Sequence, residues 1–323
     1  MNKSVFISGA LKVSEFFGAA LGALLRPLSS DIKCSIVRAC GFLRDRLPHL
    51  LWSVARPGMY AGLRALYSRT GQHCVVTRTL APGVLMDLDI SQKTQRRIYT
   101  ERAYEASVVS YFAETIQPGD GFIDVGANVG YYTLLASHWV GLQGVVHAFE
   151  PEQQNFTRLQ TQIARNKLSN VVTHHAAAGA KPGRLTLNLN PLNEGGHSLK
   201  PFDAYFDDGR AQSKEHIQKE FSEQTLSQEV EVVALSETLA NDGRQWHMKV
   251  DVEGAELEAL QGARSFIMEA RPDICCEISG DTPELRGLLE NLQYEVYNLR
   301  SGGLLEKALT LSPGNYILKP INK

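Results

Sequence analysis

The stretch FIDVGANVGYYT, which runs from Phe122 to Thr133, decides the fold. Its first residues suit a buried strand, Gly126 and Gly130 mark a tight turn, and the residues after the turn suit a helix. A glycine turn between a strand and a helix lets the backbone approach a ligand closely, because no side chain stands in the way. We therefore expect a nucleotide-like cofactor at this turn.

Strands and helices alternate along the chain from this stretch onward. The predicted strands are 121–125, 145–149, 171–175, 184–190, 229–235, 248–252, 273–278, 295–299 and 316–318. The predicted helices are 129–139, 152–166, 255–269 and 283–292, with a short helix near residue 237. Such alternation is typical of α/β proteins with a doubly wound, mostly parallel sheet, here of seven strands. The last two strands have no helix between them, which predicts an antiparallel C-terminal edge.

The chain before residue 72 differs from the rest. Residues 1–71 are rich in apolar and basic residues, are interrupted by prolines, and predict a helical extension. Residues 72–323 predict the main domain, which begins with two short strands within residues 73–90 and one helix over residues 95–116. Residues 191–228 form a long polar insert with weak periodicity.

Charge is distributed unevenly along the sequence. The formal net charge is −2, but residues 1–80 contain eleven basic and three acidic residues, so the remainder is acidic by about ten charges. A basic front end suggests an anionic partner, or it is simply a solvated helical surface that happens to be basic. We do not expect nucleic acid as a partner, because the acidic body shows no stripe of basic and aromatic residues.

The cysteines and the one apolar run bear on the compartment. The five cysteines are Cys34, Cys40, Cys74, Cys275 and Cys276. Because no CxxC pair occurs, we predict no disulfide framework, no zinc site and a reducing, cytoplasmic compartment. The apolar run in residues 16–25 is shorter than the roughly 20 residues that span a bilayer. An interfacial helix with peripheral contact to the inner face of a membrane, or ordinary helix packing, fits it better.

The spacing in the glycine turn argues against a dinucleotide. The NAD fingerprint is GxGxxG, whereas this turn is GxNxG, with Asn128 in place of the middle glycine. Asn128 puts a side chain where a pyrophosphate needs bare backbone, which disfavours an NAD(P)-dependent oxidoreductase. Asp124, just before the turn, either ties the loop amides together or faces the ligand.

Glu150 ends the next predicted strand, 20 residues after Gly130. A carboxylate at this position can accept both hydrogens of a ribose diol. It can also cap the following helix, for which Pro151 suits a first helical position. We favour the ribose role, because strand, glycine turn, helix, strand and terminal acid together indicate a nucleoside site.

A third motif, MKVDVEG, begins at residue 248. Lys249, Asp251 and Glu253 share one face of the predicted strand and its end. Charges on a buried strand are costly unless they are paired or functional. We therefore place Asp251 at the ligand crevice, with pairing to Lys249 as the purely structural alternative.

The three motifs together resemble the FkbM-type family of S-adenosylmethionine-dependent methyltransferases, which has a Rossmann-like sheet. The resemblance rests on FIDVGANVGYYTLLA, VVHAFEPEQQNFTRLQTQIARNKLSNV and MKVDVEGAELEALQGA, in this order, and runs over about residues 104–279. It implies an α/β methyltransferase whose cofactor is S-adenosyl-L-methionine.

The resemblance also implies roles for individual residues. The residues implied in cofactor binding are Gly126, Asn128, Gly130, Glu150 and Glu105, the last from a Tyr-Glu element. Asp124 is a further candidate for cofactor binding because it directly precedes the turn. Glu150 is implied to hold the ribose, and Asp251 to lie near the methyl group and the acceptor. The third strand is followed by HHAAAG, which offers no acid to the adenine amine, so we expect backbone or apolar contacts there.

Family members typically methylate hydroxyl groups on sugars or natural products, so the resemblance implies a small-molecule or saccharide acceptor. A neutral hydroxyl is a poor nucleophile and needs a general base or a metal. The candidate bases are Asp251, Glu253 and His197, the last in a glycine-bearing loop of the polar insert. Two carboxylates are too few to predict a metal site.

The last expectations concern the position of the polar insert and the alternatives to methyl transfer to a hydroxyl. We expect residues 191–228 to cover the acceptor site, because long loops in compact domains are often lids. A nitrogen acceptor stays open beside a hydroxyl. The alternatives from other classes are an NAD(P)-dependent oxidoreductase and a non-catalytic nucleoside-binding module, since a fold alone does not fix a function.

Overall fold

The structure, a computed structural model, describes residues 18–20, 22, 25, 30–47, 49–67, 73–190, 195–199, 204–207, 210–213 and 226–321. Within these ranges, no helix combines the length and the apolarity that a membrane span requires. The chain divides into two compact units, which are Met1–Thr79 with Leu85–Tyr104, and Leu80–Val84 with Glu105–Lys323. The predicted boundary between residues 71 and 72 stays a proposal.

The first unit is built mainly from helices and a β-hairpin. Its elements are α2 (Ser30–Arg46), α3 (His49–Tyr67), β1 (Val75–Ala81), β2 (Val84–Asp89) and α4 (Lys93–Thr100). The prediction of a single helix over residues 95–116 is wrong, because α4 ends at Thr100 and α5 begins only at Ala106. Glu105, in the break, has a left-handed φ of 48°. Neither glycine nor proline marks this break in the sequence.

Some of the basic residues of the first unit bind its own main chain. The Arg44 guanidinium donates to the carbonyl of Tyr99 and lies 5.0 Å from the centroid of its ring. Arg78 donates to the carbonyl of Glu101 at 2.7 Å, and also to that of Ile98. These two cations therefore serve neither as a solvated surface nor as a binding patch for an anionic partner.

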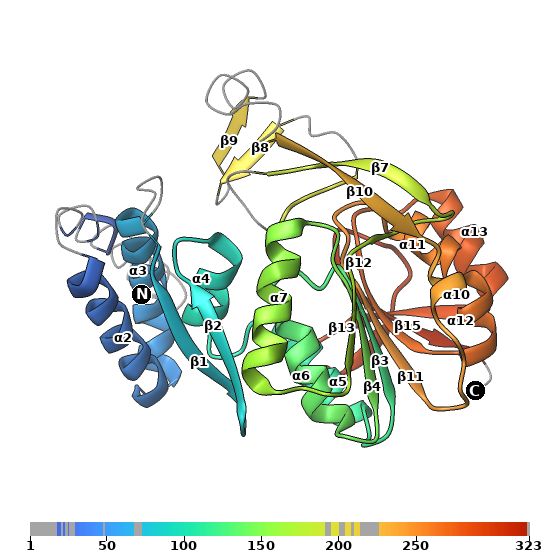
Figure 1. The fold of residues 1–323 in the computed structure, drawn as a ribbon, viewed down its shortest axis with the longest axis horizontal. Coiled ribbons are helices and arrows are strands. Elements are labelled where there is room, and N and C mark those ends of the chain that lie inside the picture. The colour runs from blue at the N-terminus through green and yellow to red at the C-terminus, as the bar shows by residue number, and fades with distance from the viewer. Residues whose placement is uncertain are drawn as a thin grey trace, which may run out of the picture. The chain divides into compact units, whose positions relative to one another are not determined.

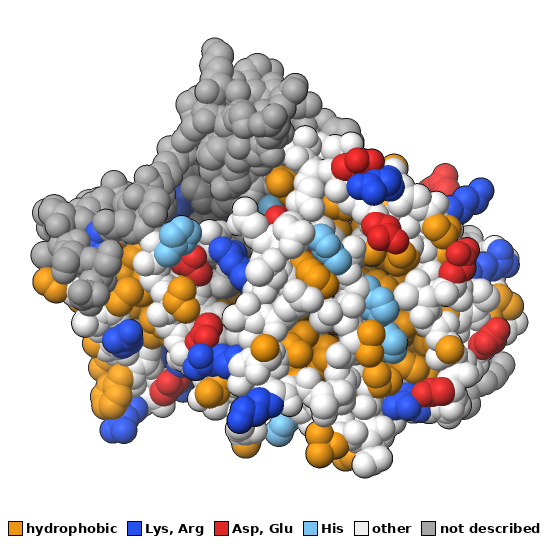
Figure 2. All heavy atoms as spheres, in the orientation of Figure 1, with side chains coloured by type: hydrophobic (Ala, Val, Ile, Leu, Met, Phe, Trp, Pro, Cys, Tyr) orange, Lys and Arg blue, Asp and Glu red, His pale blue; other side chains and the backbone are white. Residues whose placement is uncertain are grey.

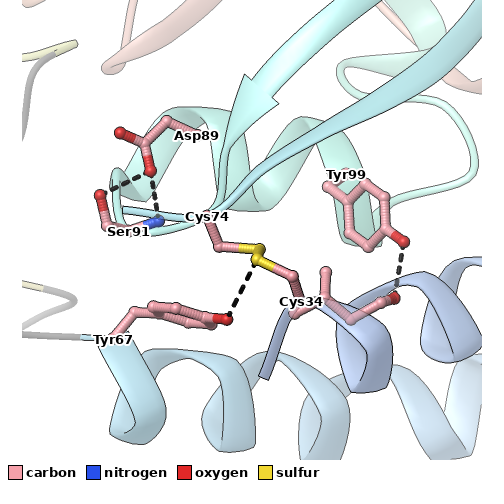
Figure 3. Close-up of a disulfide and its surroundings, with 7 residues drawn as sticks. Cys34, Tyr67, Cys74, Asp89, Ser91 and Tyr99 are labelled. Carbon is pink, nitrogen blue, oxygen red and sulfur yellow. Dashed lines mark hydrogen bonds between the residues drawn. A yellow bond between two sulfur atoms is a disulfide. The ribbon is translucent and has the colours of Figure 1, made fainter. Parts of the chain in front are cut away.

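A disulfide joins Cys34 in α2 to Cys74 just before β1, with the Cα atoms 5.9 Å apart (Figure 3). The Tyr67 hydroxyl lies 4.0 Å from the Cys34 sulfur. The expectation that the cysteines stay unpaired is wrong for this pair, because the two are 40 residues apart and only the folded hairpin brings them together. The cysteines thus no longer support the cytoplasmic location, which stays a prediction.

The second unit contains an eight-stranded sheet in the order β14-β13-β15-β12-β11-β3-β4-β5 (Figure 1). Its strands are β3 (Gly121–Val125), β4 (Val145–Phe149), β5 (Val171–His174), β11 (Trp246–Val250), β12 (Asp273–Ile278), β13 (Tyr294–Leu299), β14 (Leu305–Lys307) and β15 (Gly314–Pro320). The strands from β12 to β5 pair in parallel, and the three C-terminal strands pair antiparallel. The doubly wound sheet with its antiparallel edge is confirmed, and β14 is one strand more than predicted.

Helices cover both faces of this sheet, with α5, α6 and α7 on one face and α11, α12 and α13 on the other (Figure 1). Their bounds are α5 (Ala106–Thr115), α6 (Tyr131–Val140), α7 (Gln153–Asn166), α11 (Glu256–Gly262), α12 (Arg264–Ala270) and α13 (Pro283–Leu292). Buried apolar side chains such as Ile123, Trp246 and Phe266 form the core on the second face. The helix predicted over 255–269 is divided at Ala263 into α11 and α12.

A smaller sheet and a hairpin complete the second unit. The smaller sheet has the order β6-β10-β7, from β6 (Ala177–Ala178), β7 (Gly183–Asn188) and β10 (Ser227–Val233), and α10 (Leu235–Thr238) follows. The hairpin, β8 (Ala204–Asp207) with β9 (Arg210–Ser213), lies within the polar insert. Most of residues 191–228 lies outside the described residues. On the face seen in Figure 2, acidic and basic side chains of the described surface are interspersed.

Candidate active site

The glycine turn between β3 and α6 has an unusual backbone. Gly126, Asn128 and Gly130 have φ values of 85°, 51° and 95°, in the left-handed region. A Cβ added at Gly126 would lie 1.9 Å from the carbonyl oxygen of Asp251. Only glycine fits there, because this φ strains other residues and the neighbouring carbonyl belongs to rigid backbone. The turn is thus pressed against the end of β11.

Asp124 and Gly130 fix the turn against α6 and α7. The Thr133 hydroxyl donates to Asp124 Oδ2 at 2.6 Å, and burial raises the pKa of Asp124 to about 6. A Cβ added at Gly130 would lie 2.8 Å from Leu159 Cδ1, so this glycine allows close packing against α7. Asp124 thus joins β3 to α6 through Thr133, a contact that differs from the expected tie to the loop amides, and it does not line the pocket.

Glu150, at the end of β4, is 5% exposed and faces the turn. Its two carboxyl oxygens accept hydrogen bonds from the backbone amides of Asn128 and Glu152, each at 2.8 Å. Burial raises the pKa of Glu150 to about 8, against the lowering effect of these two bonds. Each oxygen still has a lone pair for another donor, so the carboxyl can accept two hydroxyl groups.

The cap of α7 is Glu152, not Glu150. Glu152 accepts the backbone amides of Gln154 at 3.0 Å and Asn155 at 2.7 Å. These are the groups that an N-cap side chain satisfies at the start of a helix. The alternative of Glu150 as the helix cap is therefore not what the structure shows.

A pocket lies at the carboxyl ends of β3, β4 and β11 and holds about 540 Å³ of empty space, including its open mouth. We call one side of it, formed by Gly126, Asn128, Glu150 and residues 176–178, the nucleoside end. Residues 176–178 are the three alanines of the HHAAAG stretch, so this wall is apolar. Asp251 and Glu253 also line the pocket, whereas Asp124, Gly130 and Glu105 do not.

His197 lines the same pocket, from the insert. Its Nδ1 accepts the backbone amide of Asn190 at 3.0 Å, and burial lowers the pKa of the imidazole. The charge of Glu152, at the start of α7, acts on it in the opposite direction. His197 is thus held near the nucleoside end, which favours a role in closing that end over the role of general base.

Lys249 and Asp251 form an ion pair on the other side, with Nζ and Oδ2 2.9 Å apart. The Lys249 side chain is 0% exposed, whereas that of Asp251 is 29% exposed. Burial alone would lower the pKa of Lys249, but the carboxylates of Asp251 and Glu105 outweigh it and raise this pKa well above the usual value. Lys249 is therefore a fixed positive charge.

Glu105 reaches this ion pair through Tyr132. The Tyr132 hydroxyl donates to Glu105 Oε2 at 2.6 Å, and Lys249 Nζ lies 5.6 Å from the centroid of the tyrosine ring. Burial and then Glu105 raise the pKa of Tyr132 well above its ordinary value. We call Glu105, Tyr132, Lys249, Asp251 and Glu277 the charged end of the site. Of these five, Asp251 lines the pocket and the others lie behind it.

Glu277, in β12, was not predicted from the sequence. It is hydrogen-bonded to Asp251, and the charge of Asp251 followed by burial raises the pKa of Glu277 to about 9. The sequence contains a signal, because Glu277 is the one acid within the apolar run ICCEI of a buried strand. Its partner could not be inferred from the sequence, because only the order of strands in the sheet places β12 beside β11.

Glu253 has a left-handed φ of 50°, and its side chain is exposed. Its carbonyl accepts the Ser198 hydroxyl at 2.7 Å, which ties the insert to the end of β11. Across the part of the chain that the structure describes, no group of three or more His, Cys, Asp or Glu side chains is arranged to hold a metal ion.

Comparisons with known proteins point to one family. A family model described as the methyltransferase FkbM domain matches residues 124–296. Methyltransferase 1 of Beauveria bassiana is 30% identical in an alignment of 190 positions that covers 55% of this chain and 74% of that protein. The 31-O-demethyl-FK506 methyltransferase FkbM of Streptomyces tacrolimicus is 27% identical in an alignment of 199 positions that covers 53% of this chain and 68% of that protein. A crystal structure of methyltransferase FkbM from Methylobacillus flagellatus KT has a TM-score of 0.43 and 16% identity, over 88% of this chain and 58% of that one.

Proposed function

The chain belongs to the FkbM methyltransferase family. We propose that it transfers the methyl group of S-adenosylmethionine to a hydroxyl of a small-molecule or saccharide acceptor. The relative from Streptomyces tacrolimicus carries an O-methylation in its name, which supports oxygen over nitrogen as the acceptor atom. Family membership sets aside the oxidoreductase and the non-catalytic module.

The observation that carries the proposal is the hydrogen bond from the Asn128 amide, in the glycine turn, to the Glu150 carboxyl. A Cβ at Gly126 would fill the space beside the Asp251 carbonyl, so the turn keeps bare backbone at the pocket. Glu150 has one lone pair left on each oxygen after accepting two amides, which suits a ribose diol. These residues fit S-adenosylmethionine, with the adenine against the alanine wall of residues 176–178.

The charged end suits the cationic part of the cofactor. The carboxylates of Asp251 and Glu105 act on the single ammonium of Lys249, so two negative groups oppose one positive group in a mostly buried place. A sulfonium or an ammonium is stabilised there, because opposite charges attract strongly where water is excluded. When bound, S-adenosylmethionine supplies an electrophilic methyl group, and the protein supplies alignment and a dry site.

The candidate bases differ in what their surroundings allow. Burial would raise the pKa of Asp251, but Lys249 and the bond from Glu277 lower it overall, so Asp251 is a weak base. Glu253 is exposed, and His197 lies near the nucleoside end. We keep Asp251 as the residue that faces the reacting groups, in a positioning and electrostatic role.

Two further parts of the proposal concern the insert and the first unit. His197 and Leu199 of the insert line the pocket, and the Ser198 hydroxyl donates to the Glu253 carbonyl just beyond Asp251, which supports a lid over the acceptor site. If shortening the insert left acceptor affinity unchanged, the proposed lid would be wrong.

Contact of the basic first unit with an anionic membrane would appear as flotation with vesicles containing phosphatidylserine but not with neutral vesicles. Equal behaviour with both kinds of vesicle would contradict the proposed membrane contact.

The experiment for the activity uses S-adenosylmethionine labelled in its methyl group. The protein is incubated with a panel of sugars, glycolipids and hydroxylated natural products, and each is compared with the same compound carrying an amine or a methyl ether at the hydroxyl. We expect label on free hydroxyls only. Transfer should be lost in Asp251→Asn but kept in Glu290→Gln, which changes an exposed residue of α13. Label on the amines alone would contradict oxygen as the acceptor atom.

A further inference from the structure

His197 belongs to a short segment of the insert that is fixed from two sides. Its neighbour Ser198 forms an antiparallel bridge with Asn188 at the end of β7, through backbone hydrogen bonds of 2.7 and 3.0 Å. The Ser198 hydroxyl also donates to the carbonyl of Glu253 at 2.7 Å. The segment therefore extends the smaller sheet, and its side chains have fixed directions.

The side chains of His197 and Leu199 face the pocket, which both of them line. Side chains alternate along an extended segment, so these two lie on the side opposite Ser198. Leu199 packs against the buried cluster that contains Ala177 and Leu187. Ala177 belongs to the alanine wall of residues 176–178, so the segment lies at the nucleoside end of the pocket.

The hydrogen bond of His197 fixes which ring nitrogen carries the hydrogen. Nδ1 accepts the backbone amide of Asn190 at 3.0 Å, and a ring nitrogen that accepts has no hydrogen of its own. In the neutral imidazole the hydrogen is therefore on Nε2. Burial lowers the pKa of the imidazole, which favours this neutral form.

The Nε2–H group has no acceptor among the described residues. Glu152 is near enough for its charge to act on the imidazole, but its Oε1 and Oε2 accept the amides of Gln154 and Asn155 at the start of α7. No hydrogen bond joins Glu152 to His197 in the described part of the chain. The pocket thus contains a donor whose position is fixed and whose acceptor is left to a ligand.

The chemistry of adenine matches this donor. Adenine has one amine that donates and three ring nitrogens that accept. The wall of residues 176–178 is alanine and offers no carboxylate to the amine. A side chain that distinguishes adenine from an apolar ring of the same shape must therefore act on another atom, and a fixed N–H donor suits a ring nitrogen.

On the basis of the proposed function, we propose that His197 is a specificity-determining residue for the cofactor, whose Nε2–H donates a hydrogen bond to a ring nitrogen of adenine. The insert then recognises the base, while Glu150 recognises the ribose. His197 thus serves cofactor binding and leaves the deprotonation of the acceptor to another group.

The first part of the test replaces one ring nitrogen of His197 at a time. In His197→Asn, Oδ1 can take the place of Nδ1 and accept the Asn190 amide, but the donor is lost. In His197→Gln, the amide N–H reaches the position of Nε2. Calorimetry with S-adenosylhomocysteine should show an affinity about fivefold to tenfold lower in His197→Asn, and a change of less than about threefold in His197→Gln. His138→Asn, at an exposed position of α6, is the control and should leave the affinity unchanged.

The second part uses analogues of S-adenosylhomocysteine in which one ring nitrogen of adenine is replaced by C–H, namely the 1-deaza, 3-deaza and 7-deaza compounds. One of the three should bind the unmodified protein about fivefold to tenfold more weakly than the parent compound. The same analogue should lose nothing further in His197→Asn, because the hydrogen bond is already absent. The other two should show the full loss in His197→Asn.

The outcomes separate this inference from the proposed function. Equal losses for all four ligands in His197→Asn would show a purely structural role and overturn the inference, as would unchanged affinity for S-adenosylhomocysteine or an equal loss in His197→Gln. The cofactor assignment would survive each of these results. Failure of S-adenosylhomocysteine to bind the unmodified protein would overturn both. If His197→Asn did not fold, equal affinities of the four ligands for the unmodified protein would overturn the inference.

Discussion

The two ends of the site are built in opposite ways. The nucleoside end comes largely from the consecutive segments around Gly126 and Glu150, where backbone amides donate to one carboxyl. The charged end gathers side chains from separate strands and helices, among them Tyr132, Lys249 and Glu277, and the ionisation of each depends on the others. In the function we propose, recognition is thus a local property of the chain, whereas reactivity is a collective property of the fold.

Loss of Lys249 should give the largest effect. Lys249→Met leaves Asp251 without its counter-ion, and removing one partner of a buried ion pair costs about 3–5 kcal/mol of unfolding free energy. Denaturant unfolding measures this loss. In contrast, the affinity for S-adenosylhomocysteine should fall less than about tenfold, because the nucleoside end is separate.

Lys181→Met is the control for this change, since Lys181 is exposed. It should alter the unfolding free energy by no more than about 0.5 kcal/mol. If Lys249→Met were as mild as Lys181→Met, the charged end would not be electrostatically coupled.

Gly126→Ala should break the nucleoside end. The new Cβ would lie 1.9 Å from the Asp251 carbonyl, at a φ of 85°. We expect a cost of about 3 kcal/mol and loss of cofactor binding, measured by unfolding and by calorimetry.

Gly243→Ala matches this change in backbone strain, because Gly243 has a φ of 84° but no atom within 4 Å of the added Cβ. It should cost only about 1 kcal/mol and leave binding intact. Equal costs at the two glycines would show that the close approach to Asp251 has no role.

Glu150→Gln should weaken cofactor binding without a comparable loss of stability. Two hydrogen bonds to a charged group contribute about 3 kcal/mol together, so affinity should fall about 100-fold. The unmodified protein should also show a pH dependence that the variant lacks. Below a pH of about 8 the buried Glu150 is protonated and must lose its proton to accept two hydroxyls, so affinity rises with pH and levels above about 8. Calorimetry from pH 6 to 9 measures both effects, and a pH-independent affinity in the unmodified protein would contradict the role of Glu150.

The smallest effect on either end should come from the disulfide. Replacing both Cys34 and Cys74 by serine opens a loop of 40 residues, which lowers stability by about 2–4 kcal/mol, within the first unit. Cofactor affinity should change less than about twofold, since the site residues all lie in the second unit. Thermal unfolding measures the loss of stability, and calorimetry on the same preparation measures the cofactor affinity. A large fall in affinity would show that the site depends on the first unit.

Sequence reasoning reached the nucleoside end because its signals are local. Gly126, Asn128 and Glu150 lie in a strand–turn–helix–strand pattern whose spacing is visible in the chain itself. The fold was predictable for the same reason, since alternating strands and helices leave few topologies open. The extra strand β14 is only three residues long and carries no such signal.

The charged end was only partly predictable, because its partners are set by the order of strands in the sheet. Asp251 was identified from its own strand, but Glu277 joins it only because β12 lies beside β11. The disulfide between Cys34 and Cys74 escaped prediction in the same way, since its partners are distant in sequence. Long-range pairing is the part of the structure that periodicity and spacing do not encode.

The most direct test of the cofactor assignment is calorimetric titration of the unmodified protein and of Glu150→Ala with S-adenosylmethionine, S-adenosylhomocysteine and NAD. We expect binding of the two sulfur compounds alone, weakened about 100-fold or more in Glu150→Ala. Binding of NAD instead, or unchanged binding of S-adenosylmethionine in Glu150→Ala, would contradict the assignment of Gly126, Asn128 and Glu150 to this cofactor.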